Sequence, residues 1–399
     1  MSLTLVPPLA SFVAIDILPR WEVGFPLVMS DATIILAGGG TGGHLYPGIA
    51  VAQALGAAVP GAAPLFLCTA REIDRVILEP TGFKYIAQPI VPPQRSVGGL
   101  LKFWRSWRDT KDQVRRILRE QKPAAVVGLG GYAAGVAVKL AALRGIPTAI
   151  LNPDVIPGKA NQYLMRYANV VCCQFAGAAD HIAPEYRSKL KITGCPIRQE
   201  FSSLPPKAEA AARLEIDPLL NTLVVTGASQ GAITVNEATT TLAGSITLNG
   251  WQILHLSGRD HAETVRREYR EQNITARVID FTPAMADVWS VADLAISRSG
   301  ASSCAELTAC GVPSILMPYP FHRDLHQRAN ASVLADAGAA VLVDDEKDRK
   351  KNAEKLRPIV ESLLYDAPRR KTMAQAAKGL GHPNAACAVA NAVAELIKK

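Results

Sequence analysis

The feature that most limits what this chain can fold into is a unit that recurs along it. Each unit is a short apolar run, then a turn rich in glycine, then an amphipathic segment of helical length. Such alternation predicts parallel sheets with helices on both faces. The predicted strands of the first half are 33–37, 64–68, 124–128 and 148–151. Those of the second half are 221–226, 252–256, 276–279, 293–296 and 314–317.

The pattern restarts near residue 221, after a charged stretch over 198–218 that contains prolines and is the expected linker. A chain of 399 residues is also too long for one core. We therefore predict three structured parts and one extension. These are an N-terminal domain over 29–197, a C-terminal domain over 198–380, a last helix over 381–399 that packs back on the N-terminal domain, and an irregular extension over 1–28. The extension has the pattern of neither a membrane span nor a signal peptide.

Composition narrows the function only a little. Hydrophobic residues make up 49% of the chain and charged residues 20%, which is ordinary for a soluble globular protein. The net charge of +8 suits nucleic acid, anionic lipid or phosphorylated substrates and does not choose among them. The seven cysteines lack the paired spacing of metal sites, which is typical of reduced thiols in a cytoplasmic protein.

The first glycine turn, 38–43, follows a predicted strand and precedes a predicted helix. Ligands of open α/β sheets bind at the carboxyl ends of the strands, where glycines admit a phosphate close to backbone N–H groups. Gly38, Gly40 and Gly43 also match the dinucleotide fingerprint of dehydrogenases. However, residues 69–71 after the next strand include no acid to bind a ribose. We therefore predict a substrate site and no cofactor.

His44 ends this turn, at the edge of the sheet where a ligand is expected. A histidine in a sequence is more often structural than catalytic. This one follows a glycine loop and is not on an apolar face, so we interpret it as a candidate general base.

Two further turns follow strands of the second half. The turn 226–232 contains Ser229, whose hydroxyl is suited to a diphosphate at a helix N-terminus, although the turn could be a plain connection. The turn 297–306 contains Ser303 and Glu306. These two residues could be only a capping box of the following helix. Alternatively, the Glu306 carboxylate bridges two vicinal ribose hydroxyls.

Metal binding is the less favoured interpretation of the remaining polar residues. His322 and His326 are spaced to present two ligands from one helix, but no third ligand is near them in the sequence. No Asp-x-Asp pair stands near a glycine turn. We predict no metal site.

Together these turns resemble the MurG family, the N-acetylglucosaminyltransferases of peptidoglycan lipid II synthesis. The matching segments occur in family order between residue 31 and about residue 340. They are 38–44, 130–135, 158–161, 194–198, 227–232, 298–306 and 324–330. The resemblance implies the GT-B fold, with two Rossmann-like domains whose parallel sheets face a deep cleft. The donor would bind in the C-terminal half and the acceptor mainly in the N-terminal half.

The resemblance also implies substrate contacts at matching positions. In the first half these are Thr41, Gly42, Gly43, Tyr132, Asp154 and Asn161. In the second half they are Arg198, Ser229, Thr282, Ala301, Ser302, Ser303, Cys304, Ala305, Glu306, His326 and Gln327. Arg198 and Ser229 would approach the donor diphosphate, the backbone at Thr282 the uracil, Glu306 the ribose and Gln327 the sugar.

The sequence departs from the family at two of these positions. Asp154 stands where the family has an asparagine, so this carboxylate is a second candidate base beside His44. His326 takes the place of a glutamine.

The reaction that the resemblance implies is a metal-independent, inverting transfer. The donor is UDP-N-acetylglucosamine, and the acceptor is the muramyl C4 hydroxyl of the undecaprenyl-diphosphate-linked peptide, which converts lipid I to lipid II. The enzyme would act as a peripheral protein on the anionic cytoplasmic surface of the cell membrane, and nucleic acid would not be a partner. Two alternatives stay open: another GT-B glycolipid glycosyltransferase, and a UDP-N-acetylglucosamine 2-epimerase.

The segment 100–118 predicts a helix with one apolar face. Leu100, Phe103, Trp104 and Trp107 would lie on this face, which continues through Val114 and Leu118. We expect the later turns to pack on the sheet. In the first turns the aromatic residues stand among lysines and arginines, a pattern that suits the headgroup boundary of an anionic membrane. We predict membrane contact there.

Overall fold

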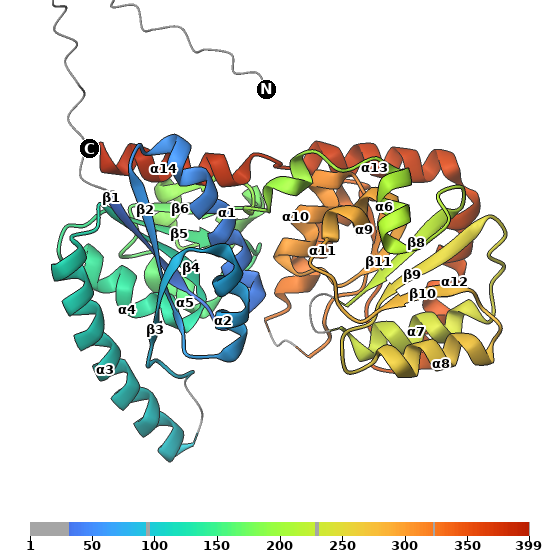
Figure 1. Cartoon of the computed structure of the whole chain (residues 1–399), viewed down its shortest axis with the longest axis horizontal. Coiled ribbons are helices and arrows are strands. Elements are labelled where there is room, and N and C mark those ends of the chain that lie inside the picture. The colour runs from blue at the N-terminus through green and yellow to red at the C-terminus, as the bar shows by residue number, and fades with distance from the viewer. Residues whose placement is uncertain (1–31, 93–95, 228–230, 322–323, 399) are drawn as a thin grey trace, which may run out of the picture. The chain divides into compact units, whose positions relative to one another are not determined.

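The computed structural model describes residues 32–92, 96–227, 231–321 and 324–398. Residues 31–399 belong to one compact unit that contains two sheets (Figure 1). The extension predicted over 1–28 lies outside the described residues.

The first sheet has seven parallel strands in the order β3-β2-β1-β4-β5-β6-β7. They are β1 (Ala32–Gly38), β2 (Ala62–Thr69), β3 (Lys84–Gln88), β4 (Ala125–Gly130), β5 (Thr148–Asn152), β6 (Val170–Cys173) and β7 (Leu190–Ile192). The α-helices of this half are α1 (Gly42–Ala58), α2 (Glu72–Leu78), α3 (Val97–Gln121), α4 (Gly131–Ala142) and α5 (Lys159–Leu164). Short 3₁₀ helices are η1 (Glu79–Thr81), η2 (Ala176–His181), η3 (Pro184–Lys189) and η4 (Gln199–Ser202).

The second sheet has six parallel strands in the order β10-β9-β8-β11-β12-β13. They are β8 (Asn221–Thr226), β9 (Trp251–Leu256), β10 (Ala276–Ile279), β11 (Ala292–Ser297), β12 (Ser314–Leu316) and β13 (Ala340–Leu342). The helices are α6 (Lys207–Leu214), α7 (Ile233–Ala243), α8 (Ala262–Glu271), α9 (Met285–Val291), α10 (Ala301–Cys310), α11 (His326–Asp336), α12 (Arg349–Tyr365), α13 (Ala367–Leu380) and α14 (Ala385–Ile397).

Burial on both faces explains why the central strands are apolar throughout. In β1, Ile34 and Leu36 join one buried cluster, whereas Ile35 and Ala37 join the cluster on the opposite face. The same alternation holds for β8, where Val224 faces away from its neighbours Leu223 and Val225. All nine predicted strands are present, which confirms the α/β class with two parallel sheets.

Each sheet reverses its strand order at its centre, at β1 and β4 in the first sheet and at β8 and β11 in the second. The turns that follow these four strands therefore lie at the switch points where α/β proteins bind ligands. All the glycine turns singled out in the sequence follow one of these strands.

The expected linker 198–218 is more ordered than predicted. It contains α6, which packs against α9, and the side chains of Ala210, Ala211 and Leu214 lie in a core of the second half. Alanine and leucine favour a helix, and the apolar face finds a partner, so this stretch is not a free linker.

The last helix, α14, packs against α1 of the first half (Figure 1). Val389, Ala390 and Val393 share a buried cluster with Ile34 and Leu36 of β1. The exact domain boundaries stay a prediction. None of the helices in the described ranges is long and apolar enough to cross a membrane.

Val393 is fully buried against the first sheet, so a charge there would have no partner and no water. We expect Val393→Asp to lower the free energy of unfolding by at least about 3 kcal/mol, measured by urea denaturation. Glu395→Ala is the control on the same helix, because its ion pair with Lys191 is exposed and should contribute less than about 1 kcal/mol. A Val393→Asp protein as stable as the wild type would contradict the packing of α14.

Candidate active site

A pocket of about 390 Å³ lies at the carboxyl ends of the central strands, a size that suits a small-molecule ligand. The first half contributes the turn after β1 and the segment after β5, with Thr41, Gly42, Gly43, His44, Tyr46, Pro153 and Asp154. The second half contributes Arg198, Thr226, Leu256, Asp280, Phe281, Thr282, Pro283, Met285, Trp289, Gly300, Ala301, Ser302, Ser303, Glu306, His326 and Gln327. Thirteen of the residues predicted from the sequence to bind substrate or to catalyse are among these.

The first glycine turn is held by a carboxylate that the sequence analysis missed. Asp74 is fully buried and accepts hydrogen bonds from the backbone N–H of Gly40 at 2.7 and 2.9 Å. It also accepts from the backbone N–H and the hydroxyl of Thr69, at 2.8 and 2.7 Å. Arg71 donates to the Gly40 carbonyl at 2.8 Å. These contacts from the β2–α2 segment fix the turn before any ligand arrives.

The surroundings of His44 favour one tautomer. Its Nδ1 lies 3.2 Å from the carbonyl oxygen of Gly39, which can only accept, and 3.2 Å from the Thr41 hydroxyl, which can also accept, so a proton on Nδ1 satisfies both contacts. The other ring nitrogen, Nε2, is then the proton acceptor. Burial lowers the pKa of His44 below 6.5, although the bond to Gly39 and the negative charges of Asp154 and Asp74 oppose this shift. The imidazole is therefore neutral at pH 7, as a general base must be.

The His44 ring lies against the backbone of Gly130 and Gly131, at the start of α4. A Cβ on either glycine would come within 3.0 Å of the ring, and both residues have positive φ, +108° and +71°. A side chain there would be strained and would displace the imidazole. The glycines of the segment 130–135 thus make room for the imidazole of His44, the candidate base of the first glycine turn.

Glu306 does not belong to a capping box. Helix α10 begins at Ala301 with Gly300 as its N-cap, so Ser303 is inside the helix and cannot cap it. Instead, the Glu306 carboxylate lines the pocket and accepts a hydrogen bond from the Trp289 indole at 2.9 Å. Burial raises the pKa of Glu306 to about 7, against the effects of the indole bond and of Arg198. The structure therefore favours the ligand-binding interpretation.

Arg198 lies between two aromatic rings at the wall of the pocket. Its guanidinium is 5.5 Å from the centre of the Tyr46 ring and 5.0 Å from that of Phe201. It donates to the Pro283 carbonyl at 2.6 Å and pairs with Glu200 at 3.0 Å. A planar cation held in this way can present donors to a phosphate.

Asp154 is held by the second half of the chain. Its Oδ1 accepts from the Asn330 side chain at 2.7 Å, and the Asn330 oxygen accepts from the Val155 backbone N–H at 3.0 Å. Asn330 is fully buried, and its NH₂ group also lies 3.2 Å from the Ser299 carbonyl oxygen. One oxygen of this candidate base is therefore already engaged.

Gln327 is oriented by a bond through its amide oxygen, which accepts from the Tyr319 backbone N–H at 2.9 Å. The NH₂ group of Gln327 is thus the part that can reach a ligand, as a donor. In addition, the Ser299 hydroxyl donates to the backbone carbonyl of Gln327 at 2.8 Å.

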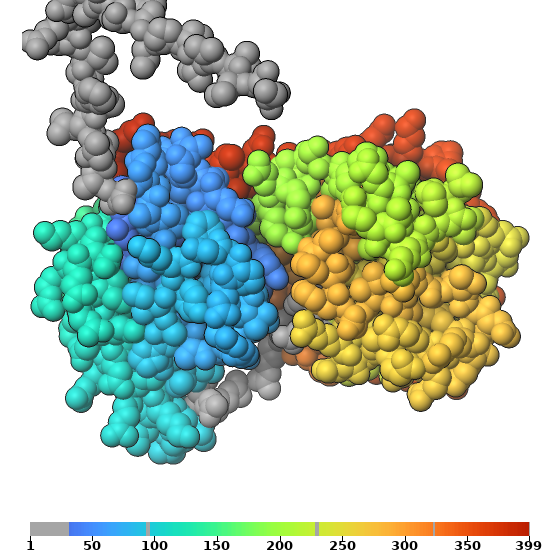
Figure 2. Space-filling model, viewed as in Figure 1, coloured from blue at the N-terminus to red at the C-terminus, as the bar shows by residue number. Residues whose placement is uncertain are grey.

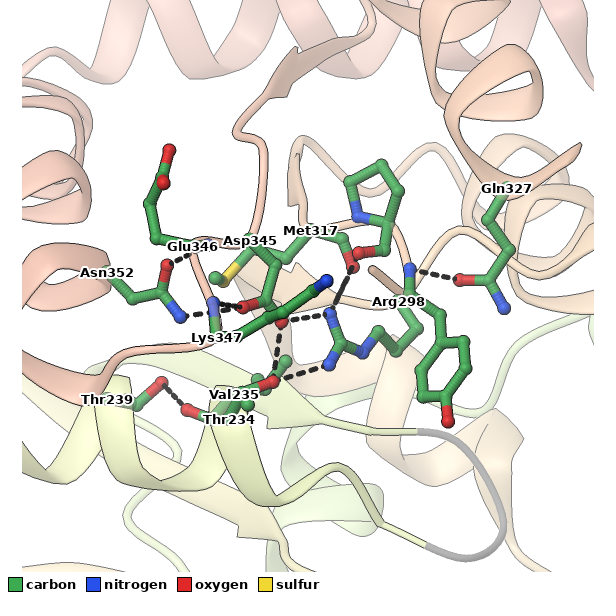
Figure 3. A network of polar contacts seen from close by, with 12 residues as sticks. Thr234, Val235, Thr239, Arg298, Met317, Gln327, Asp345, Glu346, Lys347 and Asn352 are labelled. Carbon is green, nitrogen blue, oxygen red and sulfur yellow. Dashed lines mark hydrogen bonds and ion pairs between the residues drawn. The ribbon is translucent and has the colours of Figure 1, made fainter. Parts of the chain in front are cut away.

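A buried ion pair lies beside this segment. Figure 3 shows Arg298 reaching toward Asp345, Thr234 and the backbone of Met317. Arg298 pairs with Asp345 at 2.8 Å, with 5% and 0% of the two side chains exposed, and donates to the carbonyls of Met317 and Pro318. Burial alone would raise the pKa of Asp345, but bonds from Thr234 and other donors hold it below its usual value. This network fixes the start of the loop that leads to Gln327.

Four of the predicted contacts are not among the residues that line the pocket, and one cannot be placed. Cys304 and Ala305 are buried in a core of the second half. Asn161 is buried and donates to the Leu151 carbonyl at 2.8 Å, so its role is to hold the β5 segment. Tyr132 lies beside the first glycine turn, near Gly40. Ser229 lies outside the described residues.

The site also depends on three residues for which the sequence offered no signal, two of them in the pocket lining and one, Asp74, buried behind the first glycine turn. Tyr46 lies about one helical turn after the glycine turn, and its sequence context is that of a residue in the hydrophobic core. Asp74 sits in an ordinary charged helix, 34 residues from the backbone that it binds. Trp289 is 17 residues from Glu306, on another helix. Within the described ranges, no group of three or more His, Cys, Asp or Glu side chains is arranged to hold a metal ion. Metal independence stays a prediction.

Comparisons with known proteins identify related chains. The N-terminal domain of glycosyltransferase family 28 matches residues 34–173, and its C-terminal domain matches residues 222–389. The UDP-N-acetylglucosamine--N-acetylmuramyl-(pentapeptide) pyrophosphoryl-undecaprenol N-acetylglucosamine transferase of Halothermothrix orenii is 33% identical, over 92% of this chain and 99% of its own.

Two solved structures add to this. The crystal structure of MurG from Acinetobacter baumannii has a TM-score of 0.71 and 27% identity, and the match covers 91% of this chain and 99% of that one. UDP-GlcNAc 2-epimerase from Neisseria meningitidis has a TM-score of 0.64 at 14% identity, with 91% and 100% covered. The second likeness shows a shared fold only.

The hydrogen bonds of Asp74 to the first glycine turn predict that the stability of the protein depends on this carboxylate. Asp74→Asn replaces an acceptor oxygen with an NH₂ group that would face backbone N–H donors. We expect a loss of about 1–3 kcal/mol in the free energy of unfolding, measured by urea denaturation. Glu72→Gln on the same helix is the control, because its ion pair with Arg75 is exposed and should contribute little. Equal stability of both variants would show that the turn does not need the carboxylate.

Proposed function

This chain belongs to glycosyltransferase family 28 and, within it, to the MurG family, and on that premise we propose its reaction. It transfers N-acetylglucosamine from UDP-N-acetylglucosamine to the C4 hydroxyl of the muramyl sugar on undecaprenyl-diphosphate-linked MurNAc-peptide. The fold is GT-B, with two Rossmann-like halves. The product corresponds to lipid II of peptidoglycan synthesis.

The observation that supports this most directly is that Glu306, Arg198 and a neutral His44 line the same pocket. A buried carboxylate suits the vicinal hydroxyls of a ribose, and a stacked guanidinium suits a diphosphate. The first turn of α10, at Ala301, Ser302 and Ser303, adds backbone N–H donors at a helix N-terminus. A uridine diphosphate sugar requires these three kinds of group.

The chemical step is a direct displacement. The acceptor hydroxyl attacks the anomeric carbon as its bond to the UDP oxygen breaks, which inverts the configuration. His44 Nε2 takes the hydroxyl proton, because Nδ1 is occupied by the Gly39 carbonyl. Arg198 and the N–H groups of the helix N-termini stabilise the negative charge that develops on the leaving UDP. The Gln327 NH₂ group would donate to an oxygen of the transferred sugar.

Asp154 is the other candidate for the base. Its negative charge stabilises a protonated His44, so it supports proton transfer even where it does not accept the proton itself. Because Asn330 already engages one of its oxygens, we assign the proton to His44.

The reaction is tested with labelled UDP-N-acetylglucosamine, incubated with and without the lipid-linked muramyl acceptor. A transferase releases UDP and labels the lipid only when the acceptor is present. A 2-epimerase would convert the sugar without any acceptor, and label on a different glycolipid would identify another glycolipid glycosyltransferase.

The base assignment predicts distinct effects for the two candidates. We expect His44→Ala to lower kcat by roughly a hundredfold or more, while the Kd for UDP changes little, because the imidazole lies on the acceptor side of the pocket. Asp154→Asn keeps the bond to Asn330 and should lower kcat much less. Loss of turnover in Asp154→Asn alone would make Asp154 the base.

We also propose that the first turns of α3 contact an anionic membrane surface. Val97, Leu101 and Trp104 are 86%, 70% and 64% exposed, and Leu100 is 44% exposed. Lys102, Arg105 and Arg108 are exposed around them. Figure 2 shows this part of α3 (teal) standing out below the blue elements of the first half. Apolar side chains ringed by cations suit an interface of anionic headgroups.

The packing of α3 supports a smaller membrane face than the one predicted from the sequence. The Trp107 ring packs against Gly135 of α4, and Phe103, half-buried, stacks against Trp107 with ring centres 5.7 Å apart. Ile117, which was not among the residues of the predicted apolar face, is buried together with Val114 and Leu118. The helix turns one face to the sheet along most of its length, so Trp104 and Leu101, and not Trp107, point outward.

The exposed residues give the test of membrane binding. Leu101→Ser with Trp104→Ser should reduce sedimentation with anionic vesicles several-fold and reduce activity on the lipid-linked acceptor. Activity on a short-chain soluble acceptor should be retained. Leu219→Ser is the matched control, because Leu219 is 91% exposed in the second half. Unchanged vesicle binding of the double variant would contradict the proposal.

A further inference from the structure

We propose that Trp289 is a positioning residue of the donor site, whose indole N–H fixes the Glu306 carboxylate in the orientation that accepts both ribose hydroxyls of a uridine diphosphate. The inference rests on the proposed function, which supplies the nucleoside diphosphate. It assigns a role to a residue that contributes no charge to the pocket.

The geometry supports this role. The Trp289 Nε1 lies 2.9 Å from Glu306 Oε2, and both residues line the pocket. Trp289 is 3% exposed, and its ring belongs to the core of the second half with Leu307 and Ala305. Because α9 packs against α10, the indole cannot move without the core. The Glu306 carboxylate therefore accepts a hydrogen bond from a rigid donor, which holds its side chain in one rotamer.

The bond leaves the carboxylate its full capacity for a vicinal diol. Each carboxylate oxygen has two lone pairs, and the indole N–H, which can only donate, uses one of the four. Oε1 and the second lone pair of Oε2 can each accept one ribose hydroxyl. A carboxylate that is already ordered loses less conformational freedom when the ligand binds.

The same bond acts on the charge of Glu306. A donor to the ionised form favours that form, so the indole lowers the pKa of Glu306 against the effect of burial, which brings it to about 7. The other charged groups that face Glu306 are Arg198, which lowers its pKa, and Glu200, which raises it. Tyr46, Cys195 and Cys310 also face it, and all three are neutral near pH 7, with pKa values raised by burial.

Phenylalanine tests the bond without removing the ring. Trp289→Phe should weaken UDP binding about tenfold at pH 7, measured by isothermal titration calorimetry. Without the indole donor the pKa of Glu306 rises. The pH at which UDP affinity falls by half should therefore move upward from near 7.

Trp251→Phe is the matched control. Trp251 is a buried tryptophan of the same half, and its indole donates to the Leu364 carbonyl at 3.2 Å, outside the pocket. This variant should lose comparable thermal stability but bind UDP with the wild-type affinity and pH midpoint. A loss of UDP affinity in both variants would attribute the effect to destabilisation and overturn the proposal.

A double-mutant cycle separates positioning from packing. In a Glu306→Met background no side-chain oxygen is left to accept from the indole, so adding Trp289→Phe should change the Kd for UDP by less than about twofold. A tenfold effect that persists in this background would show that Trp289 acts through the shape of the pocket, which would overturn the proposal.

A measurement on the unsubstituted protein covers the case in which Trp289→Phe does not fold. With ¹⁵N-labelled indoles, the Trp289 N–H resonance should shift with a midpoint near pH 7, and the shift should be absent in Glu306→Gln. A resonance that does not titrate would overturn the proposal, even if transfer of the sugar is found. Failure of the wild-type protein to bind UDP would overturn the donor site itself.

Discussion

Strands of a parallel sheet all end at the same edge, and the pocket of this chain depends on that constraint. The residues that follow β1 and β11 and the last residue of β8 come from distant parts of the sequence. They meet in the pocket because each lies at the end of a central strand, where the strand order reverses. Helices begin directly after the turns that follow β1 and β11, so the pocket receives N–H donors and the positive ends of helix dipoles. A site for a diphosphate thus follows from the topology before any side chain is considered.

The side chains that complete the pocket are held by groups from neighbouring segments. Asp74 ties the first glycine turn to the end of β2, the Gly39 carbonyl favours one tautomer of His44, and Trp289 fixes Glu306. In each case a rigid partner holds a polar group in place by a hydrogen bond. Burial of that group without such a bond would be unfavourable. The buried pair of Arg298 and Asp345 follows the same principle beneath the loop that leads to Gln327 (Figure 3). Such contacts order the site before the ligand binds.

The elements that could be predicted from the sequence are those with local signals. Nine strands were predicted, most of them because burial on both faces makes them continuous apolar runs. The four missed strands, β3, β6, β7 and β13, have only three to five residues. Glycine turns were recognised for a similar reason, since the residues required for a close backbone approach are adjacent in the chain. Asp74, Tyr46 and Trp289 were missed because their partners are brought to them only by the fold. The helical periodicity put Trp104 and Trp107 on one apolar face with Val114 and Leu118. In the structure Trp107 packs with those residues and against Gly135, whereas Trp104 is 64% exposed, because the contacts with α4 decide which aromatic ring is covered.

Burial shifts the pKa values of His44 and Glu306 in opposite directions. These two pKa values determine the pH range in which both residues have the charge that their proposed roles require. The pKa of His44 falls below 6.5 and that of Glu306 rises to about 7. In the roles proposed above, His44 must be neutral to act as a base and Glu306 must be ionised to bind a ribose, and both conditions hold above pH 7. On that proposal Glu306 is protonated first as the pH falls, so donor binding is lost before the base. The raised pKa also means that the ionised Glu306 costs roughly 3 kcal/mol of stability above pH 7, a cost that is absent below its unperturbed value of 4.5. Hydroxyl groups of a bound ribose would donate hydrogen bonds to the ionised carboxylate and so offset part of this cost.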